Sequence, residues 1–199
     1  ASGIPFVLVA NETPEKSIYN FVSSNNYDSV SDLLDYMVCM GHSRIAYVGL
    51  INQMLESHRE RLRAYMDVLK RHKIRIRKEF ILDLPNAEKV TIKNELIRLF
   101  SRPEPPTALF YASEDLSEIW TLLKQRGISV PGDLSVAGMR MGGSEPPLPQ
   151  ELSSIIQPTE ELGIAGVHAL LEHIETRKSV HCVLKNTVLY GDSIRKVTS

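Results

Sequence analysis

The sequence has few cysteines, no long apolar run and no excess of basic residues, and each shortage excludes a class of protein. Its two cysteines, Cys39 and Cys182, lie far apart in apolar segments, so we expect reduced core thiols in a cytoplasmic protein and no disulfide framework. No stretch approaches the roughly 18 uninterrupted apolar residues of a transmembrane helix, so we expect no membrane partner. The 23 basic and 24 acidic residues give a formal net charge of −1, which argues against a nucleic-acid-wrapping surface on these residues.

The start of the chain lacks an initiating methionine and the basic leader of a signal peptide. Its first residues therefore indicate a strand in a fragment of a longer protein. What is present is ordinary for a globular protein: 43% of the 199 residues are hydrophobic and 24% are charged. A chain of this length can form one large domain or two small ones.

Short apolar segments alternate with stretches of helical periodicity. The apolar segments predict strands at residues 4–9, 17–22, 44–50, 79–82, 107–111 and 134–138. Apolar residues three or four positions apart predict helices at 27–40, 56–72, 88–101 and 115–126. The alternation predicts a parallel sheet covered by helices on both faces.

This alternation ends after Gly138. Residues 139–152 are rich in glycine, proline and methionine and have no periodicity, so we expect a loop there. Beyond it we expect a strand at 154–157, a helix from Pro158 to Arg177, and final strands at 180–184 and 187–190.

No arrangement of catalytic residues is apparent. The sequence has no glycine-rich phosphate loop and no Gly-x-Ser-x-Gly nucleophile turn. Its six histidines are scattered and no cysteine pair assists them. His42 is expected to cap the helix that Gly41 ends, and the basic run at 70–78 is expected to be a solvated helix end. We therefore expect no enzyme, no catalytic residue, no metal site and no cofactor.

Six segments, in order and at matching spacing, resemble the lactose/galactose-repressor (LacI/GalR) family of regulators. They are Ile4–Val9, Met40–Gly49, Ser57–Tyr65, Pro106–Phe110, Gly127–Gly138 and Gln157–Gly163. The most diagnostic is Gly-Ile-Ser-Val-Pro-Gly-Asp-Leu-Ser-Val-Ala-Gly at 127–138. The resemblance extends along nearly the whole chain.

The resemblance implies the α/β fold of the type-I periplasmic binding proteins. This fold has two parallel-sheet subdomains with helices on both faces, three crossover segments, and an effector in the cleft between the subdomains. On this mapping residues 1–42 and 156–178 form an incomplete N-terminal subdomain, and residues 43–155 and 179–199 form the C-terminal subdomain. The implied function is effector sensing and dimerisation in a DNA-binding transcriptional regulator, whose helix-turn-helix headpiece, absent from this chain, would bind operator DNA.

The resemblance also assigns effector-binding residues, namely Ser57, Arg61, Ser113, Glu114 and Arg140. Ser57 and Arg61 match the family's serine and arginine at a helix start. The family's Ala-Asn-Asp is here Ala-Ser-Glu at 112–114. Its Gly-Tyr/Phe-Asp-Asp, whose first aspartate binds sugar hydroxyls, is here Gly-Met-Arg-Met at 138–141.

Two further family positions differ from the pattern. Ala10 stands where an aspartate would face the cleft, and Leu84 lies near the position of an aromatic residue that stacks on the ligand. The loss of acids, with Arg140 opposite Arg61, predicts a cationic cleft that suits a sugar phosphate or a carboxylate. The alternatives are a cleft that binds nothing tightly and an Arg140 that points to solvent from a mobile loop.

Two other functions are compatible with the same pattern of strands and helices. One is the solute-binding protein of a sugar transport system, and the other is an α/β enzyme that would need the catalytic residues missing here. The segment at 127–138 favours the regulator. A regulator is expected to be a homodimer, since operator half-sites are related by two-fold symmetry. Exposed apolar residues at Ile119, Trp120 and Leu123 are candidates for the interface, although a core position is an equal alternative for Trp120.

Overall fold

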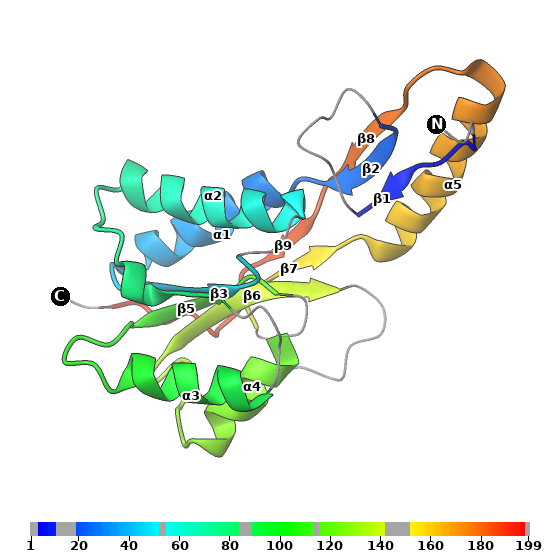
Figure 1. Cartoon of the computed structure of the whole chain (residues 1–199). Coiled ribbons are helices and arrows are strands. Elements are labelled where there is room, and N and C mark those ends of the chain that lie inside the picture. The colour runs from blue at the N-terminus through cyan, green and yellow to red at the C-terminus, as the bar shows by residue number, and fades with distance from the viewer. Residues whose placement is uncertain are drawn as a thin grey trace.

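The computed structural model describes residues 4–10, 19–51, 55–83, 89–113, 116–141 and 152–197 and divides their strands between two sheets (Figure 1). The smaller sheet has the order β1 (Leu8–Val9), β2 (Phe21–Ser24), β8 (His181–Leu184), and its strands are parallel. The larger sheet has the order β4-β3-β5-β6-β7-β9, with β9 antiparallel to β7 and the other pairs parallel. Its strands are β3 (Ile45–Gly49), β4 (Ile81–Asp83), β5 (Ala108–Tyr111), β6 (Ser135–Met141), β7 (Ser154–Gln157) and β9 (Thr187–Leu189).

Helices cover both faces of the larger sheet, as Figure 1 shows. On one face lie α1 (Asn26–Cys39) and α2 (Glu56–Arg71). On the other lie α3 (Lys89–Phe100) and α4 (Leu116–Gln125), and a 3-10 turn, η1 (Lys78–Phe80), precedes β4. Because β3 and β5 are buried on both faces, their sequences are continuous apolar runs without alternation. The predicted α/β class with a helix-covered parallel sheet is therefore confirmed.

The smaller sheet is covered by α5 (Thr159–Thr176), which packs on it through a small cluster containing Val22, Leu162 and Ala169. Gly166 lies where this helix crosses β1. A Cβ at this position would lie 2.7 Å from Cγ2 of Val9, so the close approach of helix and strand depends on the glycine.

The chain passes between the two sheets three times, at residues 24–26, 157–159 and 184–187. These segments match the three crossovers that the family resemblance implies. Side chains tie them together: Gln157 Nε2 donates to Ser24 Oγ at 3.3 Å, and the backbone N–H of Asn186 donates to Asn25 Oδ1 at 2.7 Å.

Two elements lie with a different sheet from the one that the sequence-based division gives them. Residues 1–42 are assigned to the smaller subdomain, yet Val30, Leu33 and Met37 of α1 pack in the core of the larger sheet. Residues 179–199 are assigned to the larger subdomain, yet β8 pairs with β2 in the smaller sheet. Periodicity shows that a helix has an apolar face, but it does not show which sheet that face covers.

Strand bounds also differ from the predictions at several points. Within the predicted strand at 4–9, β1 covers Leu8–Val9, and β2 begins four residues later than the strand predicted at 17–22. The loop predicted from residue 139 is wrong at its start, because β6 continues to Met141. Met139 is fully buried in the core, and this burial extends the strand beyond the point where the local composition becomes loop-like. Of the rest of that predicted loop, residues 142–151 lie outside the described residues, and Leu152 is buried in the core beneath α3 and α4.

The end of α1 is formed as expected by Gly41 and by the backbone of His42, while the ring of His42 has a separate role. Gly41 has φ +94°, and its N–H and that of His42 donate to the carbonyls of Val38 and Met37. The buried imidazole instead contacts Thr107 Oγ1 at 2.9 Å and the carbonyl of Arg195 at 3.1 Å. Only the backbone of His42 caps the helix, while its ring holds the C-terminal segment against the larger sheet.

The exposure expected of the candidate interface on α4 is wrong for two of its three residues. Ile119 is 0% and Leu123 is 2% exposed, and both belong to the core beneath α3 and α4. Trp120 is half-buried and packs against the same core, in line with its alternative core position. None of the described helices combines the length and the apolar content that a membrane span requires.

Candidate functional site

The carboxyl ends of the parallel strands of the larger sheet form the edge that is nearer to the smaller sheet (Figure 1). Ligands of open α/β sheets bind at this edge, because the loops that leave the strands there create a crevice. The first turn of α2, the end of β5 and the end of β6 all contribute residues to it. We call this region the carboxyl edge.

Arg61, on α2, is held at the carboxyl edge by hydrogen bonds to two other segments of the chain. Its side chain is 1% exposed; Nε donates to Asn26 Oδ1 at 3.1 Å, and Nη1 donates to the carbonyl of Ala112 at 2.8 Å. Asn26 is itself buried, and its Nδ2 donates to the carbonyl of Ser24 at 3.1 Å. A continuous chain of hydrogen bonds therefore runs from the first crossover, through Arg61 on α2, to the end of β5.

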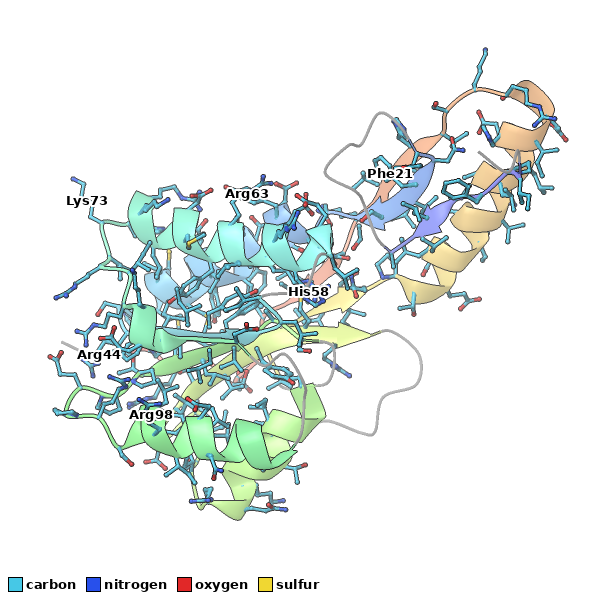
Figure 2. All side chains as sticks on the ribbon, in the orientation of Figure 1. Phe21, Arg44, His58, Arg63, Lys73 and Arg98 are labelled. Atoms are coloured by element: carbon cyan, nitrogen blue, oxygen red, sulfur yellow. The ribbon has the colours of Figure 1, made fainter. Side chains whose placement is uncertain are left out.

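His58 lies in the first turn of α2, one turn before Arg61, and is neutral at physiological pH (Figure 2). It is 3% exposed, and its Nδ1 is buried without a hydrogen-bond partner in the part of the chain that the structure describes. Burial, and secondarily the positive charge of Arg61, lowers the pKa of His58 to about 4. An uncharged imidazole thus lies beside a permanently charged guanidinium.

Tyr47, on β3, carries a second unpartnered polar atom near Arg61. Its hydroxyl is buried and has no hydrogen-bond partner among the described residues, whereas the neighbouring Tyr65 hydroxyl donates to the carbonyl of Ile45 at 2.9 Å. Burial raises the pKa of both hydroxyls, and the charge of Arg61 opposes this rise at Tyr47. Both phenols are therefore protonated and able to donate.

The structure brings four of the five sequence-assigned residues to the carboxyl edge. Ser57 is 7% exposed in the first turn of α2, and Ser113 is half-buried just beyond β5. Arg140 is half-buried on β6, two positions past Gly138, whose register partner is Tyr111. It is thus level with Ser113 and belongs to a strand, not to the mobile loop considered from sequence. Glu114 lies outside the described residues.

Ala10 and Leu84 are the two further positions at which the sequence differs from the family pattern, and the structure describes only the first of them. Ala10 is exposed at the end of β1 with φ +58°, and its N–H donates to the carbonyl of Val22 at 2.8 Å. Leu84 lies outside the described residues. Among the described residues, no group of three or more His, Cys, Asp or Glu side chains is placed to hold a metal ion.

Sequence reasoning did not identify Asn26, His58 or Asp83 as parts of this edge. Asp83 ends β4, and its Oδ1 accepts the N–H of Ile51, which follows β3. Asn26 and Asp83 each follow or end a strand, which is a signal that could have identified them. The burial of His58 has no such signal, because it depends on how α2 packs against the sheet.

A family model described as the periplasmic binding protein-like domain matches residues 34–194. The protein assigned as the HTH-type transcriptional repressor ExuR of Bacillus subtilis (strain 168) is 27% identical over an alignment of 203 positions, which covers 98% of this chain and 59% of the relative. The arabinose metabolism transcriptional repressor of Geobacillus stearothermophilus is 30% identical over 149 residues, 73% of this chain and 40% of the relative. The chain thus spans only part of the length of these relatives.

A solved structure has the same fold over nearly the whole chain. The protein assigned as a LacI transcriptional regulator from Bacillus cereus subsp. cytotoxis NVH 391-98 superposes with a TM-score of 0.83 at 24% identity. The match covers 98% of this chain and 70% of that protein.

Proposed function

Because the chain belongs to the periplasmic binding protein-like domain family, we propose that it is the effector-sensing core of a transcriptional regulator of the LacI/GalR type. The relatives named above are transcriptional repressors and regulators, which favours this role over solute transport or catalysis. In this proposal the protein acts in the cytoplasm as a homodimer. Operator DNA is bound by residues outside these 199, since the B. subtilis relative is the longer protein.

The effector site proposed here is the carboxyl edge, and the observation that carries it is the position of Arg61. Its guanidinium is buried where α2 begins and β5 ends, and it is held by Asn26 and Ala112. The amino end of a 16-residue helix adds a partial positive charge of about half a unit. Arg140 and Ser113, level with each other on neighbouring segments, extend the same edge. This combination favours an anionic effector, such as a sugar phosphate or a sugar carboxylate.

Neutral donors beside the guanidinium allow the edge to hold the uncharged part of the effector. The phenol of Tyr47 and the neutral imidazole of His58 both carry atoms that have no partner within the described residues. Buried polar atoms of this kind destabilise the empty protein by about 1–3 kcal/mol each. A ligand hydroxyl or a bridging water at the edge would satisfy them.

The hydrogen bond from Arg61 to Asn26 connects the proposed site to the crossovers. Asn26 is the last residue of the first crossover and the first of α1, and the crossovers are joined by the Ser24–Gln157 and Asn25–Asn186 contacts. An effector that repositions Arg61 would therefore alter the segment about which the two sheets move. A preference for one arrangement of the sheets would then change DNA affinity in the intact dimer.

The test is calorimetric titration of the chain with glucose 6-phosphate, gluconate and glucose. We expect either anion to bind at least about tenfold more tightly than glucose, because a charge-assisted hydrogen bond contributes about 1.5–3 kcal/mol. Arg140→Gln should remove most of this preference, while Arg75→Gln, which changes an exposed arginine away from the edge, should not. Tighter binding of glucose than of both anions would overturn the anionic effector. Unchanged binding in Arg140→Gln would remove this residue from the site.

A further inference from the structure

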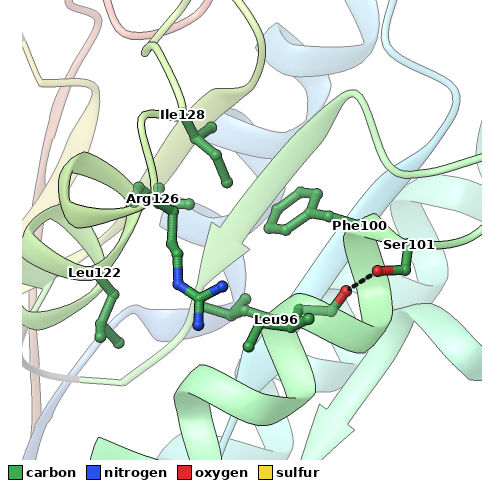
Figure 3. A pocket seen from close by; sticks show the side chains of 8 residues that line it. Leu96, Phe100, Ser101, Leu122, Arg126 and Ile128 are labelled. Carbon is green, nitrogen blue, oxygen red and sulfur yellow. Dashed lines mark hydrogen bonds between the residues drawn. The ribbon is translucent and has the colours of Figure 1, made fainter.

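A cavity of about 230 Å³ lies between α3 and α4, on the face of the larger sheet that these helices cover (Figure 3). Its floor is formed by Leu96 and Leu123, which are 5% and 2% exposed and belong to the core. Its walls include Phe100, Leu122 and Ile128, which are partly buried against the same core. The cavity is therefore a gap between two packed helices, lined mainly by apolar side chains.

One cation and one hydroxyl interrupt this apolar lining. Ser101 Oγ already donates to the carbonyl of Ile97 at 2.8 Å (Figure 3). Arg126, just past the end of α4, extends its side chain across the cavity toward Leu96 (Figure 3). Arg126 is exposed, and its guanidinium has no hydrogen bond or ion pair within the part of the chain that the structure describes. An unpaired cation thus lies over an apolar floor.

We propose that this cavity binds a small carboxylate with an apolar body, such as an aromatic acid with a single ring. The ring would lie against Leu96, Phe100 and Leu122, and the carboxylate would accept hydrogen bonds from Arg126. A planar guanidinium can hold both carboxylate oxygens, which fixes the orientation of the acid. This site is separate from the carboxyl edge and does not depend on the effector proposed there.

The size and lining of the cavity restrict the ligand. A dry apolar cavity of about 150 Å³ holds benzene, so about 230 Å³ has room for one ring and a carboxylate. A sugar would place several hydroxyls against leucine and phenylalanine side chains, where they would lose hydrogen bonds to water without replacement. The cavity therefore selects a different ligand chemistry from the one expected at the carboxyl edge.

The experiment uses benzoate, benzamide and acetate as probes, with binding measured by titration of backbone amide resonances. The three probes separate the ring from the charge, since benzamide keeps the ring and acetate keeps the carboxylate. We expect benzoate to bind about five- to tenfold more tightly than benzamide, since the ion pair is partly exposed and screened. Acetate should not saturate. The resonances that shift should be those of α3 and α4.

Three variants test the assignment of the cavity. Arg126→Gln should reduce the affinity for benzoate to that for benzamide. Lys124→Gln removes one exposed charge from the end of the same helix without changing the lining, and it should bind benzoate like the unaltered chain. Ile97→Trp, at a rim position that is 37% exposed, should fill the cavity and abolish binding of both ring compounds while the melting temperature is retained.

Several results would overturn this proposal. Equal affinities for benzoate and benzamide would remove the role of Arg126, and so would full benzoate affinity in Arg126→Gln. Loss of benzoate binding in Arg140→Gln but not in Arg126→Gln would place the acid at the carboxyl edge instead. A dimer seen by sedimentation, with benzoate affinity falling as the dimer forms, would show that a second copy of the chain covers the cavity.

Discussion

The larger and the smaller sheet differ in how completely helices cover them. Strands β3 and β5 of the larger sheet are buried on both sides, and each face of this sheet has its own apolar core. The smaller sheet has a cluster with three buried members, of which Val22 lies on β2 and Leu162 and Ala169 lie on the single described helix that covers this sheet, α5. Stability is therefore concentrated in the larger sheet, while the smaller sheet is held to it by the crossovers and a few polar contacts.

The apolar residues on the outward side of α5 are exposed, whereas those of α1, which packs on the larger sheet, are buried. Ile164, Val167, Leu171 and Ile174 are each 42–59% exposed and are spaced three or four residues apart along the helix. On α1 the comparable stripe of Val30, Leu33, Leu34 and Met37 is completely buried. Two helices with apolar stripes thus have opposite surroundings, which predicts very different effects of substitution.

The largest expected effect is a truncation in the core of the larger sheet. Phe110 is 0% exposed at the centre of β5, and its ring lies 6.1 Å from that of Tyr47. Phe110→Ala should lower the free energy of unfolding by about 3–5 kcal/mol, through lost burial and the cavity left behind. The measurement is urea denaturation followed by circular dichroism.

The matched change in the smaller sheet is Leu162→Ala, since Leu162 is 2% exposed in the cluster beneath α5. We expect a cost near the lower end of the range for leucine, about 2 kcal/mol, because fewer neighbours surround the void. A cost equal to that of Phe110→Ala would show that the smaller sheet is packed as well as the larger one. The contrast between the two sheets would then be lost.

The next prediction concerns the carboxyl edge, where the larger sheet buries polar side chains instead of apolar ones. Because the pKa of His58 is lowered to about 4, the unfolded chain binds a proton at this residue that the folded chain does not. Stability due to this group is fully present above about pH 6.5 and is lost as the pH falls toward 4, by about 3 kcal/mol in total. The measurement is the free energy of unfolding as a function of pH between 7 and 4.

His58→Gln, which cannot titrate, should flatten this profile. A smaller slope should remain from His42, whose pKa burial also lowers. His168→Gln, on the exposed side of α5, is the matched control and should leave the profile unchanged. An identical slope in the unaltered chain and in His58→Gln would mean that the imidazole is not buried beside Arg61.

The sequence predicts a strand or helix well where the apolar pattern of that segment alone determines its structure. The apolar runs of β3 and β5 and the periodicity of α2 correspond to the observed elements within one or two residues at either end. The sequence does not predict which sheet α1 covers or that β6 continues to Met141, because both depend on contacts between residues distant in the chain. Ile119 and Leu123 were misjudged for the same reason: an apolar side of a helix can face either solvent or a core.

The candidate site was predictable from sequence in part. Ser57, Arg61, Ser113 and Arg140 reach one edge of the sheet, since each lies near the end of a strand or the start of the helix that follows. The partner of Arg61 was not predictable, because Asn26 is 35 residues away and meets it only when α1 and α2 pack side by side. The same packing creates the buried, neutral state of His58.

The smallest expected effect is on the outward side of α5. Val167 is 59% exposed, so Val167→Gln should change the free energy of unfolding by less than about 0.5 kcal/mol. Denaturation at several protein concentrations makes this test sharper. A cost above about 1 kcal/mol that grows with concentration would show that a second copy covers the stripe in solution, since binding to the folded state adds stability by mass action. A cost that is large at every concentration would show that the stripe is buried within the chain itself, and the contrast between α5 and α1 would be wrong.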